Sequence, residues 1–188
     1  MTGLRRGELL GLRWEDVDLE AGVLYVRQTC QWLPGKGFIF GQPKTHRSTR
    51  PVALSPDTVR RLRAHRQHQL QERLALGPAY RGKDLVFANA LGEPVHQSSL
   101  RNAWLQIVKK AGVRQLRFHD LRHAHASLLL RQGVHPKIVS DRLGHSGIGI
   151  TMDTYSHVMP GLQAQAAAQL NGLFKRAVSK FGWQTVSK

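Results

Sequence analysis

The chain has 188 residues and a formal net charge of +16, with 28 Lys and Arg against 12 Asp and Glu. This length accommodates one domain with its own core, and 41% hydrophobic residues are typical of a folded chain. No apolar run approaches the roughly 20 residues that cross a bilayer, and the N-terminal segment lacks the uninterrupted apolar stretch and the small-residue cleavage site of a signal peptide. We therefore expect a cytoplasmic protein with no membrane partner. The charge favours nucleic acid as the partner, because no basic amphipathic helix of the membrane-binding kind is present.

The N-terminal part predicts a short helix followed by a small sheet. Residues 4–12 indicate the helix and residues 15–19 a turn. Residues 23–32 are rich in β-branched and aromatic side chains, which favours a strand. Two further strands are predicted at residues 38–40 and 50–54, joined by a polar run, and together they make a small three-stranded antiparallel sheet. The single cysteine, Cys30, cannot form an internal disulfide, and we expect a buried thiol there.

The rest of the chain predicts helices. Ser55 and Pro56 form a typical helix start, and Gly77 ends that helix. A short strand is predicted at residues 85–87. Further helices are predicted around residues 100–108 and at residues 119–131, 136–143, 148–158 and 161–178. The fold class is therefore mainly α with a small three-stranded antiparallel sheet, that is, α+β.

The helix at residues 119–131 presents an imidazole beside a guanidinium. At 100° per residue, His119 and Arg122 lie about 60° apart on one face. An arginine can bind two phosphate oxygens at once, and a histidine can donate a hydrogen bond or move a proton, so the pair suits a phosphodiester. A solvated basic face is the alternative. The apolar residues of this helix predict its core-facing side: Leu121, Ala124 and Leu128.

A zinc site on the same helix is a weaker alternative. His119 and His123 are four residues apart, as in metal-binding helices. The glutamate that would act as a base in such a motif is missing, and Arg122 would repel a cation.

A histidine and a tyrosine follow near the next glycine stop. Gly144 ends a helix and places His145 in a turn, and Tyr155 stands ten residues later. A lone tyrosine of this kind is usually a half-buried surface residue and a weak nucleophile. Nearby arginines would change this, because cations favour the phenolate.

Four segments in this order resemble the tyrosine recombinases, the phage integrase family: TGLRRGELLGLRWEDVD, PKTHRSTRPVAL, HDLRHAHASLLL and LGHSGIGITMDTYSHV. The resemblance covers residues 2–160, most of the chain. It implies the catalytic domain of a site-specific recombinase or integrase of a mobile element, which cleaves and rejoins double-stranded DNA through a 3′-phosphotyrosine. It also implies chemistry without a cofactor, using neither metal nor ATP.

The resemblance assigns roles to individual residues of this sequence. Tyr155 matches the nucleophile and Lys44 the general acid that protonates the leaving 5′-oxygen. His119 matches a proton shuttle for the tyrosine. Arg5 and Arg122 match two arginines that bind the phosphate. Glu8 matches an acid that orients an arginine, and His145 matches a hydrogen-bond donor to the phosphate.

Domain organisation follows from the same resemblance. Residues 1–160 are expected to form the catalytic domain and residues 161–188 a C-terminal helix and tail. The family's separate N-terminal DNA-binding domain is expected to be absent. The C-terminal helix either covers its own core or docks on a neighbouring protomer, which would make a homo-oligomer, a tetramer on DNA.

Two other functions stay open at this point. A type IB topoisomerase uses similar chemistry to relax supercoils. A non-catalytic helix-turn-helix module, formed by residues 119–143, would explain the charge but leaves Arg5, Lys44 and Tyr155 as coincidences.

Overall fold

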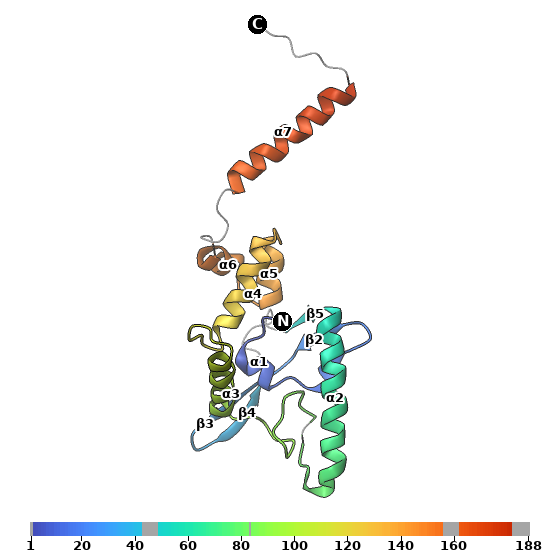
Figure 1. Ribbon diagram of the computed structural model, residues 1–188, viewed down its shortest axis with the longest axis vertical. Coiled ribbons are helices and arrows are strands. Elements are labelled where there is room, and N and C mark those ends of the chain that lie inside the picture. Colours follow the sequence, from blue (N-terminus) through green and yellow to red (C-terminus); the bar gives the residue numbers. More distant parts are fainter. Residues whose placement is uncertain (1, 43–48, 83, 156–161, 182–188) are drawn as a thin grey trace.

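The computed structural model describes residues 2–42, 49–82, 84–155 and 162–181 (Figure 1). It is mainly helical with small antiparallel sheets, so the predicted fold class is confirmed. The helices are α1 (Arg6–Leu10), α2 (Pro56–Leu76), α3 (Gln97–Lys110), α4 (Asp120–Arg131), α5 (Pro136–Leu143), α6 (Ile148–Tyr155) and α7 (Leu162–Phe181). The strands are β1 (Val17–Asp18), β2 (Val23–Val26), β3 (Thr29–Leu33), β4 (Gly37–Gly41) and β5 (Arg50–Ala53).

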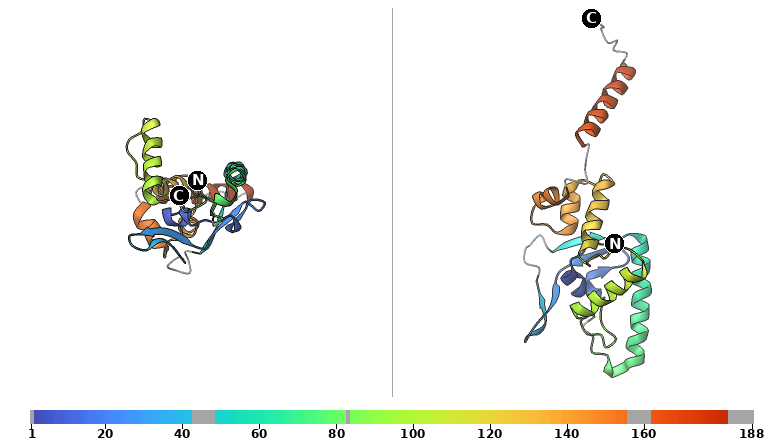
Figure 2. Two further views of the ribbon diagram at one scale, coloured as in Figure 1. Left: turned by 90° about the horizontal axis from the view of Figure 1, so that it is seen from below. Right: turned by 60° about the vertical axis from the view of Figure 1, so that its left-hand side comes forward.

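The three-stranded sheet has the order β1-β2-β5, with both neighbours antiparallel. Leu24 of β2 lies opposite Val52 of β5, and both side chains are 1% exposed. Helix α2 runs alongside this sheet (Figures 1 and 2) and adds Leu62 to the core. Its start is the predicted one, because the Ser55 hydroxyl accepts a hydrogen bond from the Thr58 amide.

The predicted strand over residues 23–32 is wrong as a single strand. It divides at residues 27 and 28, and β3 pairs with β4 in a separate two-stranded sheet. The reason is the close approach of β3 to the end of α1. A Cβ on Gly11 would lie 2.8 Å from the Cys30 amide nitrogen, so only glycine lets the two backbones meet. Cys30 is 1% exposed, as predicted.

The strand predicted at residues 85–87 does not form a ladder among the described residues. Leu85 makes an isolated bridge to Arg13, and the Val86 amide donates to the Leu12 carbonyl. These two buried residues pack as a loop segment against the turn after α1. Their apolar side chains therefore indicate burial and not a strand.

Helices α4, α5 and α6 lie together at one end of the sheet-bearing part (Figures 1 and 2) and form a second core. The predicted core side of α4 is wrong: Leu128 is 51% exposed and Ala124 is exposed. The opposite helix face is buried, because it packs on α5 and α6. Its buried members are Arg122, His125, Ala126 and Leu130.

Helix α7 extends away from the other helices in all three ribbon views (Figures 1 and 2). Its described side chains at residues 167–168 and 170–177 are exposed, including Leu170, Leu173 and Phe174 at 55%, 62% and 67%. The side chains of Leu162 and Ala166, which the sequence also singles out, lie outside the described part. None of the helices described has both the length and the apolar content that a membrane span requires.

Candidate active site

A cavity of about 660 Å³ lies where the N-terminal segment, β3, the start of α4 and the turn between α5 and α6 meet. Tyr155, at the end of α6, lines it too. The structure brings six residues singled out from the sequence to this cavity: Arg5, Glu8, His119, Arg122, His145 and Tyr155. Lys44 lies outside the described residues.

Glu8 organises one side of the cavity. Its carboxylate accepts hydrogen bonds from the amide and guanidinium of Arg5, both at 2.8 Å, and from both terminal nitrogens of Arg50, at 3.0 and 2.9 Å. Burial by itself would raise the pKa of Glu8, but the hydrogen bonds and charge of Arg50, with the bonds from Arg5, outweigh it and hold the pKa below its ordinary value. The carboxylate therefore stays ionised between two cations.

Arg122 is 5% exposed and is held by main-chain oxygens. Its terminal nitrogens donate to the carbonyls of Gly3 at 2.6 Å and Leu143 at 2.7 Å. Burial, followed by the charges of Arg5 and Arg50, lowers the pKa of Arg122 to about 10, which leaves it cationic at neutral pH. A guanidinium has five N–H donors, so two carbonyl bonds leave capacity for an anion in the cavity.

Gly144 allows the turn that places His145. It ends α5 in the left-handed conformation, with φ 68°, and its carbonyl accepts a bond from Arg5 at 2.8 Å. The His145 Nδ1 atom lies 2.8 Å from the Thr151 hydroxyl. Burial and the neighbouring charges of Arg122 and Arg5 lower the pKa of His145 to about 4, so the ring is neutral at neutral pH.

Tyr155 is 3% exposed, and its hydroxyl lies 2.7 Å from Nδ1 of His123. Burial raises the pKa of this phenol, while the charge of Arg122 lowers it by less. The phenol is therefore protonated at neutral pH. His119 directly precedes α4 and is exposed, and its ring meets the His123 ring edge to face with centroids 5.0 Å apart.

Sequence reasoning missed two residues of this site. Arg50 forms the buried bond to Glu8, and a signal for it existed: in β5 it alternates with exposed Pro51 and so shares the inward face of Val52. His123 entered the sequence analysis only as a zinc ligand. Its contact with Tyr155 joins α4 to α6 across 32 residues, and no local pattern predicts that.

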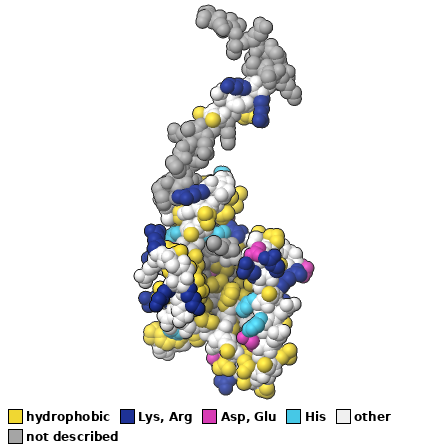
Figure 3. All heavy atoms as spheres, in the orientation of Figure 1, with side chains coloured by type: hydrophobic (Ala, Val, Ile, Leu, Met, Phe, Trp, Pro, Cys, Tyr) yellow, Lys and Arg dark blue, Asp and Glu magenta, His cyan; other side chains and the backbone are white. Residues whose placement is uncertain are grey.

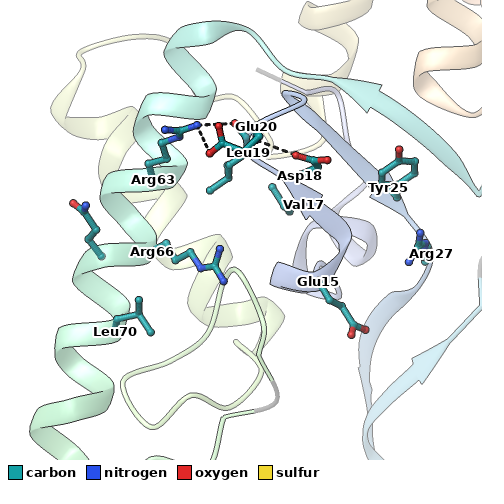
Figure 4. A pocket seen from close by; sticks show the side chains of 11 residues that line it. Glu15, Val17, Asp18, Leu19, Glu20, Tyr25, Arg27, Arg63, Arg66 and Leu70 are labelled. Atoms are coloured by element: carbon teal, nitrogen blue, oxygen red, sulfur yellow. Dashed lines mark hydrogen bonds and ion pairs between the residues drawn. The ribbon is translucent and has the colours of Figure 1, made fainter.

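A second hollow, between α2 and the β1–β2 hairpin, has a different character (Figure 4). Its arginines lie beside acidic side chains. Arg63, for example, donates hydrogen bonds to the Glu20 carboxylate at 2.8 Å and to the Leu19 carbonyl. Glu15 and Asp18 add further negative charge to its lining. This hollow is not suited to a phosphate. Among the described residues, no group of three or more His, Cys, Asp or Glu side chains could hold a metal ion.

Comparison with known proteins places this geometry in a family. The family model described as "Phage integrase family" matches residues 1–161. A tyrosine recombinase XerC-like protein of Caldanaerobacter subterraneus subsp. tengcongensis is 39% identical over 92% of this chain and 47% of its own length. The ICEBs1 integrase of Bacillus subtilis is 31% identical over 92% of this chain and 46% of its own. The chain thus spans about half the length of these relatives.

Solved structures share the fold. The Tn1549 transposon integrase in complex with transposon right end DNA superposes with a TM-score of 0.75 at 23% identity, over 92% of this chain and 55% of that one. The XerH site-specific recombinase bound to palindromic difH substrate, a post-cleavage complex, gives 0.62 at 28% identity, over 89% of this chain and 42% of that one. Sequence motifs, cavity, family model and fold agree, and the chain belongs to the phage integrase family.

Proposed function

We propose that this chain is the catalytic part of a site-specific tyrosine recombinase, which cleaves and rejoins double-stranded DNA through a 3′-phosphotyrosine at Tyr155. The observation that carries the proposal is the meeting of Arg5, Arg122 and Tyr155 in one cavity from three distant parts of the chain. A non-catalytic helix-turn-helix module does not require these three side chains to lie in one cavity. Metal and ATP have no part in the proposed reaction.

Arg5 and Arg122 bind the phosphate under attack. Both are cations whose side chains are held in place, Arg5 by Glu8 and Arg122 by two carbonyls. Donors fixed before the reaction stabilise the charge that gathers on the phosphate oxygens in the transition state, and removing one such donor typically costs about 10²–10³ in rate.

Lys44 and the histidines complete the reaction. Lys44 protonates the leaving 5′-oxygen as general acid, the role that its place in PKTHRST implies. His145 is neutral, and with Nδ1 turned to Thr151 it donates from Nε2 to the phosphate. His119, for which the resemblance implies a part in proton transfer, lies at the exposed rim of the cavity.

A basic segment, formed by α3 and the loop that follows it, lies next to this cavity. From residue 94 to residue 119 the sequence has no acid, but it has five basic residues, Arg101, Lys109, Lys110, Arg114 and Arg117. Figure 3 shows Lys and Arg side chains gathered over α3, whereas over α2 they are interleaved with acids. Lys and Arg side chains gathered without acids between them in the sequence suit contacts with a DNA backbone.

Residues 1–160 form the catalytic domain in this proposal, and residues 161–188 serve assembly. The exposed apolar side of α7 docks on a second copy of the chain, so that four copies act together on DNA. We infer that this activity takes place in the cytoplasm.

Trapping the covalent intermediate tests the proposal. The substrate is a pool of nicked duplexes whose sequence is randomised around the nick, so that rejoining is prevented and the target is represented whatever its sequence. The wild-type protein should accumulate a protein–DNA adduct at Tyr155, identified by peptide mapping. Tyr155→Phe should form none while binding DNA with nearly unchanged affinity. An adduct on Tyr25 or Tyr80, or one that persists in Tyr155→Phe, contradicts the assignment.

A further inference from the structure

The hydroxyl of Tyr155 has a partner that the family resemblance does not supply. In the cavity, Nδ1 of His123 lies 2.7 Å from the phenolic oxygen, and the two ring centroids are 5.9 Å apart. His123 is the fourth residue of α4, one position after Arg122, and Tyr155 ends α6. The contact therefore joins the nucleophile directly to the helix that carries a phosphate-binding arginine.

The Tyr155 hydroxyl needs a proton acceptor before it can act as a nucleophile. Burial keeps the phenol in its protonated form, and the charge of Arg122 offsets that only in part. A protonated phenol is a weak nucleophile, so its proton must leave as the oxygen attacks. A general base must lie within about 2.6–3.2 Å of the atom that it deprotonates. His123 meets that condition. It therefore replaces His119, which the family resemblance implies as the proton shuttle and whose ring meets the His123 ring edge to face.

We propose that His123 is the catalytic base of the strand-cleavage step and the catalytic acid of the rejoining step. The inference rests on the proposed recombinase function. As the Tyr155 oxygen bonds to phosphorus, its proton passes to Nδ1 of His123, and the bond from phosphorus to the 5′-oxygen breaks as that oxygen takes a proton from Lys44. In rejoining, the 5′-hydroxyl attacks phosphorus and returns its proton to Lys44, and His123 returns a proton to the departing phenolate.

Charged and titratable groups reach His123 from each element around it. On and beside α4 these are His119, Asp120 and Arg122; from the α5–α6 turn comes His145, and from α6 comes Tyr155. Arg5 and Glu8 line the same cavity from the N-terminal segment. A histidine accepts a proton only while its ring is neutral, so cleavage should slow toward acid pH.

The test compares three single variants by single-turnover adduct formation between about pH 5 and 9, the range in which histidine changes charge. His123→Asn places an amide oxygen close to the position of Nδ1, so it keeps a hydrogen-bond acceptor but removes the base. His123→Ala removes both. His119→Asn tests the competing candidate for the base, the histidine that precedes α4 and lines the same cavity. DNA affinity, measured by fluorescence anisotropy, reports whether each variant still folds.

If His123 is the base, Asn and Ala should both slow cleavage by about 10²–10⁴-fold, the usual contribution of acid–base catalysis. Both should also lose the acid-side fall in rate, which His119→Asn should retain. A His123→Asn protein with the wild-type rate would show that the residue only positions the tyrosine, and it would overturn the proposal. Wild-type protein that forms no adduct contradicts the recombinase function instead.

A second measurement needs no change at His123. Fluorotyrosine at position 155 ionises at lower pH than tyrosine. If protonation of His123 causes the fall in cleavage rate toward acid pH, the pH at the midpoint of that fall should be the same for tyrosine and for fluorotyrosine. A midpoint that moves with the acidity of the tyrosine would show that the phenol ionises without this base, and it would overturn the proposal even if the His123 variants do not fold.

Discussion

At the scale of single residues, Glu8 holds together the side of the cavity that carries Arg5 and Arg50. Its side chain is 1% exposed and bonds Arg5 and Arg50 at once. Two cations side by side repel each other, and the shared carboxylate offsets that repulsion. Arg50 is itself 5% exposed, and its third side-chain nitrogen, Nε, donates a hydrogen bond to the Arg142 carbonyl. Without the carboxylate, a buried guanidinium would lose its counter-charge.

We predict that Glu8→Gln lowers the free energy of unfolding by about 3–5 kcal/mol at neutral pH, the usual cost of breaking a buried ion pair on one side. The pKa of Glu8 is depressed in the folded state, so its stabilisation is complete above the ordinary value of 4.5 and is lost as pH falls through the lower folded value. The difference between wild type and variant should therefore shrink in acid. Urea titrations at several pH values measure it.

Glu15→Gln is the matched control, because it removes the same charge from a half-exposed ion pair with Arg13. Its effect should stay below about 1 kcal/mol and vary little with pH. If both variants lose the same free energy of unfolding, the buried ion pairs of Glu8 contribute no more to stability than the half-exposed pair of Glu15.

At the scale of elements, the turn between α5 and α6 connects the two halves of the site. Gly144 bonds Arg5 through its carbonyl, the preceding Leu143 bonds Arg122, and the next residue is His145. A Cβ on Gly144 would lie 2.6 Å from a terminal nitrogen of Arg50. This position therefore requires glycine twice, for its left-handed φ of 68° and for the close arginine.

Gly144→Ala should destabilise the protein and also slow strand cleavage, because the new methyl group displaces Arg50 and with it the Glu8 bonds. Gly133→Ala is the control: Gly133 also has a positive φ, 78°, but a Cβ there meets nothing within 4 Å. Both variants bear the left-handed cost of about 1–2 kcal/mol. Thermal unfolding should show the larger loss for Gly144→Ala, and single-turnover assays should show slow cleavage in that variant alone. Equal cleavage rates would contradict this account of the turn.

At the scale of the whole molecule, α7 leaves an apolar side uncovered. Leu170, Leu173 and Phe174 recur at the spacing of one helix face, and each is more than half exposed. A helix in water does not maintain such a face without a partner, which supports the proposed docking on a second copy. The net charge of +16 opposes association of free chains, and DNA would neutralise it.

The triple variant Leu170→Ser, Leu173→Ser, Phe174→Ser should therefore bind DNA and form the Tyr155 adduct but fail to assemble several copies on DNA. Sedimentation of protein with duplexes recovered from the adduct pool measures the assembly. A control variant with Asn171→Ser and Lys175→Ser changes exposed residues on another side of the same helix and should assemble normally. Assembly by the triple variant would show that α7 is not the contact.

The sequence by itself determined where helices begin and end, and the family. Capping residues predicted the start of α2 and glycine the end of α5, because helix ends depend on neighbours within one turn. The motifs identified six residues of the cavity, since side-chain chemistry is read directly from the sequence.

Only the tertiary structure decided which groups meet. The run at residues 23–32 divides because α1 approaches β3, and the buried face of α4 includes Arg122 because distant carbonyls bind its guanidinium. Periodicity reports where apolar residues recur, but it cannot show that a charged residue is buried with its donors satisfied. The same holds for Arg50 beside Glu8 and for His123 beside Tyr155: each contact joins elements far apart in sequence, and packing alone brings them within hydrogen-bond distance.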